Sequence, residues 1–250
     1  GGKVVDVDGN HYVDFVLGLL PITLGYCDPD VDEAVIKQIS KGNTFSLPSV
    51  LEMELSEKLV KTIPSAEMVR FGKNGSDVTT AAIRIARAYT GKEMVAVCGY
   101  HGWHDWYIST TTRNLGVPKD IVKLTKKFEF NNLESLKNLF LSFPGKIGAV
   151  MLEPSGLIPT NKNFLQSVKH ECIKNNCLLI FDEIISGFRV NLGGAQKEFG
   201  VTPDITCLGK GMANGYPLSA IVGKKEVMKL MEEIFFSATN SGETLSIAAA

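Results

Sequence analysis

The sequence predicts an α/β fold in three layers, with a mostly parallel sheet in the middle and helices on both faces. Short, continuously apolar runs alternate along the chain with longer segments whose apolar residues recur every three or four positions. Because the apolar runs lack strict in-out alternation, we expect them to be buried on both faces, as the strands of a parallel sheet are. The 250 residues, 44% of them hydrophobic, are enough for a large core.

The first elements are expected outside this alternating series. Residues Val4 to Phe15 read as two short strands around a tight turn that carries an Asp-Gly pair. Helical spacing follows from Val31 to Ile39, and again from Leu51 to Ile63, where the next residue, Pro64, ends the helix.

Strands and helices then alternate to the end of the chain. We expect strands at Met68–Phe71, Met94–Cys98, Ile147–Leu152, Leu178–Phe181, Asp204–Leu208 and Leu218–Val222, and helices at Ser76–Tyr89, Leu133–Phe143 and Phe164–Lys174. Ligands of such sheets bind outside the carboxyl ends of the strands, which directs attention to the residues that follow each apolar run.

The composition excludes several classes of function. The 26 Lys and Arg residues nearly cancel the 27 Asp and Glu residues, so the net charge of −1 favours neither nucleic acid nor an anionic membrane as a partner. The most apolar stretch, Phe15 to Tyr26, is too short to span a bilayer, and the first residues lack a signal-peptide pattern. Five cysteines without a C-x-x-C pair suit small buried hydrophobes in a reducing compartment. We therefore expect a cytoplasmic protein.

The first candidate site residues are Gly75 and Ser76, which follow a predicted strand and begin a helix. Ser76 is expected to be the N-cap of that helix. Free backbone amides and a hydroxyl at a helix N-terminus suit a phosphate group, whereas simple capping is the alternative interpretation.

The second candidate is Asp182, directly after a strand that is apolar enough to be fully buried. A buried carboxylate needs a partner, because an isolated charge is costly to remove from water. The protonated nitrogen of a pyridine ring would satisfy this carboxylate, and so would a neighbouring Arg or Lys.

The third candidate is Lys210, which also follows a predicted strand and lies between two glycines. Its amine could form a Schiff base with a carbonyl cofactor, or the side chain could simply extend to solvent. The surrounding glycines match neither the dinucleotide-binding pattern nor the phosphate-binding loop of NTPases.

A further cluster surrounds His101. The spacing of His101, His104 and Asp105 is not that of a zinc site, and we expect no metal there or elsewhere. Tyr100, just after a predicted strand, either offers an aromatic face for stacking or belongs to the core.

In their order and spacing these motifs resemble class III aminotransferases, which have the aspartate-aminotransferase fold. This is the type I fold of pyridoxal-phosphate-dependent transferases, and the chain would correspond to its large domain. The resemblance is strongest to the branch that contains glutamate-1-semialdehyde aminomutase. The matching segments are Asp6–Gly9, Val69–Ser76, Tyr100–Gly102, Leu152–Pro154, Ile180–Arg189, Gly200–Asp204 and Gly209–Leu218.

The resemblance implies pyridoxal 5′-phosphate (PLP) as the cofactor. Gly75 and Ser76 would bind its phosphate, while Tyr100 and Ile184 would lie on opposite faces of its ring. His101, next to Tyr100 in the matching motif, would belong to the same cofactor site.

The resemblance also implies the catalytic residues and a partner subunit. Lys210 would hold the cofactor as a Schiff base and Asp182 would contact its ring nitrogen, with Glu153 near the ring. Thr239 matches a threonine that reaches the phosphate of the neighbouring subunit's cofactor. A homodimer with shared active sites is therefore expected.

The implied activity is the transfer of an amino group between a small-molecule amino donor and a carbonyl compound through Lys210. Intramolecular transfer by an aminomutase is one alternative, and racemisation or decarboxylation with the same cofactor is another. Two departures weaken the aminomutase assignment and favour other carbonyl substrates, including sugar-related ones. Gly18-Leu19-Leu20-Pro21 stands where that branch has Ser-Trp-Gly-Pro, and Gly242-Glu243-Thr244 stands where it has Gly-Asn-Pro.

The resemblance further implies how the chain is divided. Residues 1–40 would form an N-terminal segment with the hairpin, and residues 41–250 the PLP-binding large domain. Because class III aminotransferases usually continue into a small C-terminal domain, the chain is expected to be a fragment without that domain. A non-catalytic or inactive truncated protein is the corresponding alternative.

Overall fold

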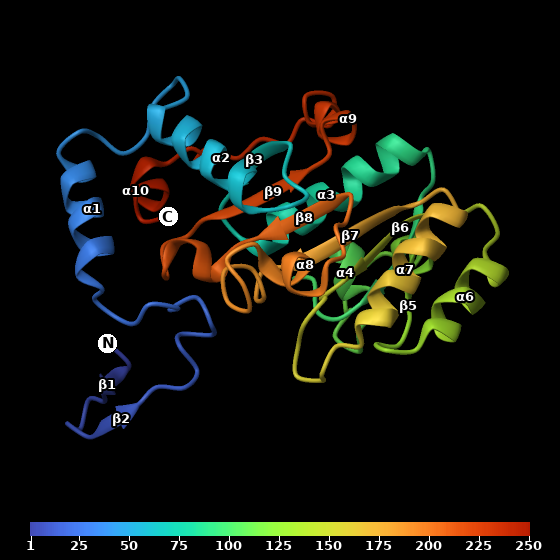
Figure 1. Cartoon of the computed structure of the whole chain (residues 1–250), viewed down its shortest axis with the longest axis horizontal. Helices are drawn as coiled ribbons and strands as arrows, with labels where there is room; N and C mark the ends of the chain where they lie inside the picture. The colour runs from blue at the N-terminus through green and yellow to red at the C-terminus, as the bar shows by residue number, and fades with distance from the viewer.

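The computed structural model describes residues 1–250, and its central layer is a seven-stranded sheet (Figure 1). The strands lie in the order β3 (Met68–Gly72), β9 (Ser219–Gly223), β8 (Ile205–Leu208), β7 (Leu178–Glu183), β6 (Ile147–Leu152), β4 (Met94–Cys98) and β5 (Thr125–Lys127). All neighbouring pairs are parallel except those of β9, which is antiparallel to both β3 and β8. The predicted mostly parallel sheet is confirmed.

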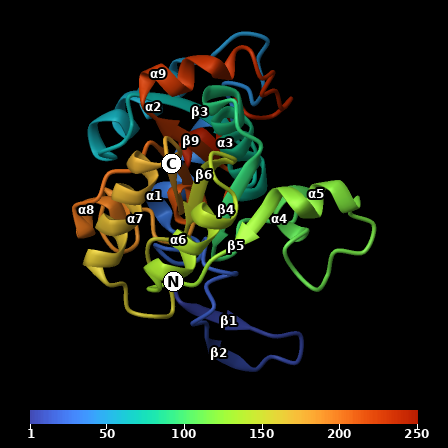
Figure 2. The ribbon, with the colours of Figure 1, turned by 90° about the vertical axis from the view of Figure 1, so that its right-hand side faces the viewer.

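Helices cover both faces of this sheet, as the two views show (Figures 1 and 2). On one face, Val95, Ile180 and other strand residues pack against α3 (Gly75–Thr90). Their sequence neighbours Ala96 and Leu179 point to the opposite face, which packs against α6 (Leu133–Ser142) and α7 (Lys162–Lys174). A third cluster joins α2 (Val50–Thr62) to β3 and β9. Burial on both faces explains why the strands are continuously apolar.

The N-terminal hairpin projects from the body of the molecule (Figure 1). Strands β1 (Lys3–Val5) and β2 (His11–Val13) pair antiparallel. Farther along, α1 (Pro29–Ile39) lies against α10 (Thr244–Ala248), where Gln38 Nε2 donates a 3.0 Å hydrogen bond to Thr244 Oγ1. The first and last helices are thus tied together. None of the helices combines the length and apolar character that a bilayer crossing requires.

The remaining elements are short and were not predicted from the sequence. They are α4 (Asp105–Ile108), α5 (Lys119–Leu124), α8 (Gly194–Phe199), η1 (Lys210–Ala213), α9 (Lys225–Met228) and η2 (Lys229–Met231). Helices of one or two turns have little stability of their own, so their formation depends on tertiary packing that a local pattern does not reveal.

The end of α3 gives a direct test of backbone strain. Gly91 caps the helix in the left-handed conformation (φ 66°), and a Cβ atom built on it meets no other atom within 4 Å. The substitution Gly91→Ala should therefore lower the free energy of unfolding by about 1 kcal/mol through backbone strain alone. Urea denaturation measures this difference. Gly156→Ala is the matched control, since Gly156 is equally open but has no positive φ, and an equal loss there would contradict the explanation.

Candidate active site

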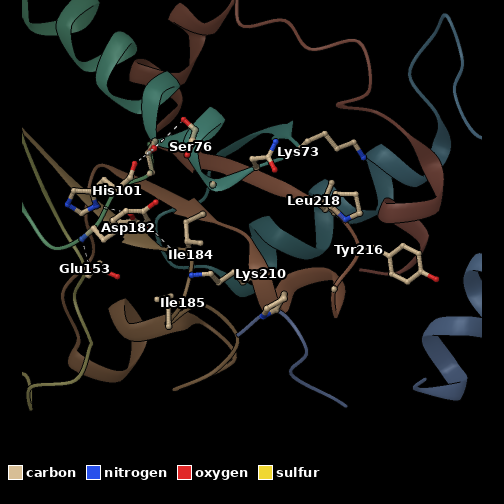
Figure 3. Close-up of a pocket in the computed structure, with 18 residues that line it drawn as sticks. Lys73, Ser76, His101, Glu153, Asp182, Ile184, Ile185, Lys210, Tyr216 and Leu218 are labelled. Carbon is tan, nitrogen blue, oxygen red and sulfur yellow. Dashed lines mark hydrogen bonds and ion pairs between the residues drawn. The ribbon is translucent and has the colours of Figure 1, made fainter. Parts of the chain in front are cut away.

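A cavity of about 280 Å³ opens where β3, β4, β6, β7 and β8 end (Figure 3). Because β3 and β8 are both antiparallel to β9, they run in the same direction, and the carboxyl ends of all five strands meet at one edge. Eight of the nine predicted site residues line this cavity, namely Gly75, Ser76, Tyr100, His101, Glu153, Asp182, Ile184 and Lys210. The strand-end rule thus located the cavity correctly.

The Asp182 carboxylate is 4% exposed and pairs with His101, in the loop that follows β4. His101 Nδ1 lies 2.8 Å from Asp182 Oδ2, and the backbone amide of Ile184 donates to Asp182 Oδ1 at 3.2 Å. The Arg or Lys partner considered from the sequence is not formed. A hydrogen bond from the imidazole offsets part of the cost of burying the carboxylate.

The imidazole of His101 is itself fixed by its surroundings. It is fully enclosed and stacks on Trp106 with an interplanar angle of 10°, while Tyr107 meets it edge-on at 5.3 Å between ring centroids. Its Nε2 atom has no hydrogen-bond partner in the protein. Aromatic packing therefore orients His101 toward Asp182 without a second polar contact.

The structure predicts a stability cost for removing this pair. His101→Phe preserves the aromatic packing but leaves the buried Asp182 carboxylate without its donor, so the free energy of unfolding should fall by about 2 kcal/mol. Urea denaturation of the whole chain checks the value. His11→Gln, at an exposed position in β2, should change it by less than about 0.5 kcal/mol. Equal losses in both variants would show that Asp182 does not depend on His101.

The N-terminus of α3 differs in one respect from the sequence prediction. The N-cap is Asn74, whose backbone amide donates to the Asp77 carboxylate at 2.8 Å, so the prediction of Ser76 as the N-cap was wrong. Asn74 takes that position because Asp77, three residues on, completes a capping box with it. The Ser76 hydroxyl accepts a 3.3 Å hydrogen bond from the Trp103 amide and remains at the cavity wall.

Three glycines let the backbone pack closely against the side chains that line the cavity. A Cβ atom on Gly75 would lie 3.3 Å from the Ile184 side chain, and one on Gly209 would lie 3.0 Å from it. Gly102, at φ 101°, lies directly against Ser76, and a side chain there would collide with the hydroxyl. A larger residue at any of the three positions would displace the side chain against which the glycine packs.

Tyr100 lies on the cavity wall with 60% of its surface exposed, so the alternative interpretation of a core aromatic was wrong. Its backbone amide donates a 2.9 Å hydrogen bond to Glu153 Oε2. Burial raises the pKa of the Glu153 carboxyl above its usual value, although the Tyr100 amide opposes this effect. Glu153 thus holds the turn that presents Tyr100.

Lys210 begins η1 with a strained backbone (φ 40°), and its side chain enters the cavity (Figure 3). Burial lowers the pKa of its amine, which the carboxylates of Asp182 and Glu153 oppose and the guanidinium of Arg189 reinforces. The solvent-extended alternative for this lysine was wrong. A lysine with a lowered pKa is a better nucleophile near neutral pH.

Sequence reasoning missed the residues that tie the N-terminal segment to this site. Arg189 donates to the Leu20 carbonyl at 2.7 Å, and the Asn214 side chain bonds both the Leu24 amide (2.9 Å) and the Gly25 carbonyl (3.1 Å). Arg189 and Asn214 stand within the motifs Ile180–Arg189 and Gly209–Leu218, but no local pattern indicates such distant partners.

Thr239 is the one predicted site residue outside the cavity. It lies in a separate hollow of about 650 Å³ between α2, β3 and the segment before α10. Its predicted contact with a neighbouring subunit's phosphate stays a prediction.

Known proteins are similar to this chain in sequence and in fold. The family model described as Aminotransferase class-III matches residues 1–250. The 3-aminobutyryl-CoA aminotransferase of Cloacimonas acidaminovorans is 44% identical over 247 residues, which cover 96% of this chain and 59% of that protein. The glutamate-1-semialdehyde 2,1-aminomutase of Natranaerobius thermophilus is 39% identical over 267 residues, with coverage of 100% and 62%. The chain thus spans about three fifths of the length of these curated relatives.

Solved structures agree with the fold. An omega-transaminase from Sphaerobacter thermophilus superposes with a TM-score of 0.91 at 31% identity, and the match covers this whole chain and 63% of that one. The FumI protein of Sphingopyxis sp. MTA144, solved in its PLP internal aldimine form, gives a TM-score of 0.94 at 29% identity, with coverage of 100% and 62%.

Proposed function

The chain belongs to the class III aminotransferase family, and on that premise we propose that it forms the PLP-binding part of an enzyme that moves an amino group between an amino donor and a carbonyl compound. One observation carries the proposal. The Lys210 amine and the buried Asp182 carboxylate face the same cavity, next to the N-terminus of α3.

The groups around the cavity fit PLP in charge and shape. The first backbone amides of α3 have no acceptor within the helix, which suits the phosphate. Asp182 suits a protonated ring nitrogen, because a carboxylate favours the charged form of a base beside it. The Ile184 side chain on the cavity wall offers an apolar surface to a flat ring, and Lys210 supplies the amine.

Asp182 and Lys210 would each have a separate role in the amino transfer. When bound, PLP supplies an electron sink for a carbanion next to its aldehyde carbon. Asp182, fixed by His101, would hold a proton at the ring nitrogen. Lys210, when neutral, would take the proton from the substrate carbon that bears the amine and deliver it to the carbon that was the aldehyde of the cofactor.

Subunit assembly and domain division belong to the same proposal. Thr239 would reach the cofactor phosphate of the neighbouring subunit in a homodimer, and residues 41–250 would form the large domain. Sedimentation equilibrium tests the first part: a strictly monomeric protein at micromolar concentration would end the dimer proposal.

A single-turnover experiment tests the activity. The protein loaded with PLP is mixed with one primary amine at a time, and the visible band of the lysine-bound cofactor is followed. Conversion to the pyridoxamine form with at least one donor is the expected result. If no donor in a broad panel converts it, amino transfer is refuted, and racemisation or decarboxylation becomes the better assignment.

The aminomutase relatives support a second candidate, intramolecular transfer. The two candidates differ in one measurable respect. An aminomutase isomerises one aminated aldehyde and aminates no separate carbonyl compound, so a reaction of a ¹⁵N-labelled donor with an unlabelled carbonyl acceptor separates them. Label in the product supports transfer between molecules.

The pKa of Lys210 predicts a pH dependence. An ammonium cannot attack an aldehyde, so the rate at which Lys210 captures added PLP should fall as the pH drops through its pKa, which burial and Arg189 lower from 10.5. Arg189→Met removes a nearby positive charge, and the inflection should move to higher pH. Stopped-flow absorbance across the pH range measures it. Arg189→Lys keeps the charge and should leave the inflection in place; an equal shift in both variants would assign the effect to lost hydrogen bonds.

A further inference from the structure

Lys73 stands on the wall between the cofactor cavity and a second, outer pocket of about 470 Å³. The two hollows share Lys73, Asn74, Tyr216 and Pro217, so they adjoin each other. Figure 3 shows the Lys73 side chain extending away from Ser76 and Lys210, toward the side on which Tyr216 lies. The outer pocket therefore continues the cavity beyond its reactive end.

An ion pair lines the outer pocket. Lys73 Nζ lies 2.7 Å from Glu243 Oε2, and the two side chains are only 15% and 12% exposed. Glu243 is fixed in turn, because its carboxylate accepts hydrogen bonds from the Ser246 hydroxyl (2.6 Å) and the Ser246 amide (3.1 Å). Glu243 also accepts from the Leu245 amide, so its oxygens are already occupied, and the pair offers a ligand the remaining N–H donors of Lys73 with no net charge.

The rest of the outer pocket is lined by neutral hydrogen-bonding groups. Three carboxamides, a phenol and a hydroxyl contribute, from Asn43, Asn74, Asn240, Tyr216 and Ser246. Only two of its nine lining residues are hydrophobic, so the pocket does not suit an aliphatic tail. Amide and hydroxyl groups are the natural partners of such a lining.

From this arrangement we propose that the outer pocket binds the neutral amide- or hydroxyl-bearing tail of an extended amine substrate, and that the Lys73–Glu243 pair excludes a charged tail. The inference rests on the proposed amino transfer at Lys210. A neutral tail accepts a hydrogen bond from Lys73 and leaves the ion pair intact, whereas an anionic tail meets the Glu243 carboxylate and a cationic tail the Lys73 ammonium at close range.

The size of the two spaces supports this division. The inner cavity, about 280 Å³, is close to the lower limit of about 300 Å³ for small-molecule sites, so we expect little of it to remain for a substrate tail beside the cofactor. The larger outer pocket remains for the rest of the substrate.

Four primary amines test the proposal on PLP-loaded protein. Propylamine has no tail, N-(5-aminopentyl)acetamide carries a neutral amide, glucosamine carries hydroxyls, and 6-aminohexanoate carries an anion at similar length to the amide. The KM for the amide or the amino sugar should be at least about tenfold below that for 6-aminohexanoate, the equivalent of one hydrogen bond to a charged group. Which of the two binds better separates an amide-bearing from a hydroxyl-bearing substrate. Equal KM values for the neutral and anionic tails would overturn the proposal.

Charge variants show whether the ion pair is responsible. In Glu243→Gln the Lys73 ammonium is uncompensated, so the preference should reverse toward 6-aminohexanoate while kcat changes little. The double variant Lys73→Gln with Glu243→Gln is neutral again and should restore the preference for neutral tails. If Glu243→Gln leaves the ratio of KM values unchanged, the pair does not select the tail.

A binding measurement separates this proposal from the proposed activity. N-(5-hydroxypentyl)acetamide has the tail but no amine, and saturation-transfer NMR detects its binding without any reaction. Asn240→Trp, at an exposed position that lines only the outer pocket, should abolish the signal and leave propylamine conversion unchanged. Failure of propylamine to react counts against amino transfer alone, whereas an undiminished NMR signal in Asn240→Trp counts against the outer pocket.

Discussion

Lys210→Ala should lose the visible absorption of the lysine-bound cofactor completely and slow amino transfer by at least about 10⁴-fold. The amine has two tasks in the proposed function, holding PLP and moving a proton at the substrate carbon, and general acid-base catalysis alone contributes about 10² to 10⁴. No other lysine can replace it, because Lys73, the second lysine at the cavity, is paired with Glu243 and directed away from Lys210. Absorbance spectra and single-turnover rates measure both losses.

The fold should survive this substitution. Removing a half-buried amine relieves its desolvation, while Ala at φ 40° keeps the backbone strain, so the free energy of unfolding should change by less than about 1 kcal/mol. Lys123→Ala, an exposed lysine of α5, is the matched control and should keep spectrum and rate. A Lys210→Ala protein that retains the visible band would remove Lys210 from the proposed site.

Five of the six predicted strands of the large sheet are buried along their whole length, and this made them recognisable in the sequence; the sixth, β3, lies at an edge and has Arg70 exposed. Two predicted strands, Met94–Cys98 and Ile147–Leu152, have the observed limits. The strand β5 (Thr125–Lys127) was not predicted. It lies at the edge of the sheet, where one side has no neighbouring strand, so its residues are not all buried and need not all be apolar. Runs of apolar residues therefore predict the interior strands of a sheet better than its edge strands.

The site could be predicted as a set of residues but not as a set of contacts. Strand-end positions indicated Asp182 and Lys210, because the direction of a parallel sheet fixes which ends meet. The pairing of Asp182 with His101 depends on β4 and β7 standing two positions apart, with β6 between them, and strand order is not encoded in local spacing. The Lys73–Glu243 pair, 170 residues apart in sequence, is hidden for the same reason.

Asp182→Asn should reduce the rate of amino transfer by about 10² to 10³-fold while Lys210 still captures PLP. The amide keeps the shape of the carboxylate and can still accept a hydrogen bond from His101, so only the negative charge is lost. Without that charge the ring nitrogen is no longer favoured in its protonated form, and electrostatic groups of this kind typically contribute such factors. The visible band reports capture, and single-turnover kinetics report transfer.

A second substitution decides whether charge or position is responsible. Asp182→Glu keeps the charge but moves the carboxylate by one methylene within a fully packed strand end, so its stability should fall more than that of Asp182→Asn. If charge is the requirement, Asp182→Glu retains more activity than Asp182→Asn despite its lower stability. The opposite order would contradict the requirement for charge, and so would a rate for Asp182→Asn within threefold of the parent. Either result would mean that the Asp182 carboxylate only stabilises the fold. The electron sink of the cofactor would then not depend on the Asp182–His101 pair, the only buried acid–imidazole pair of this chain.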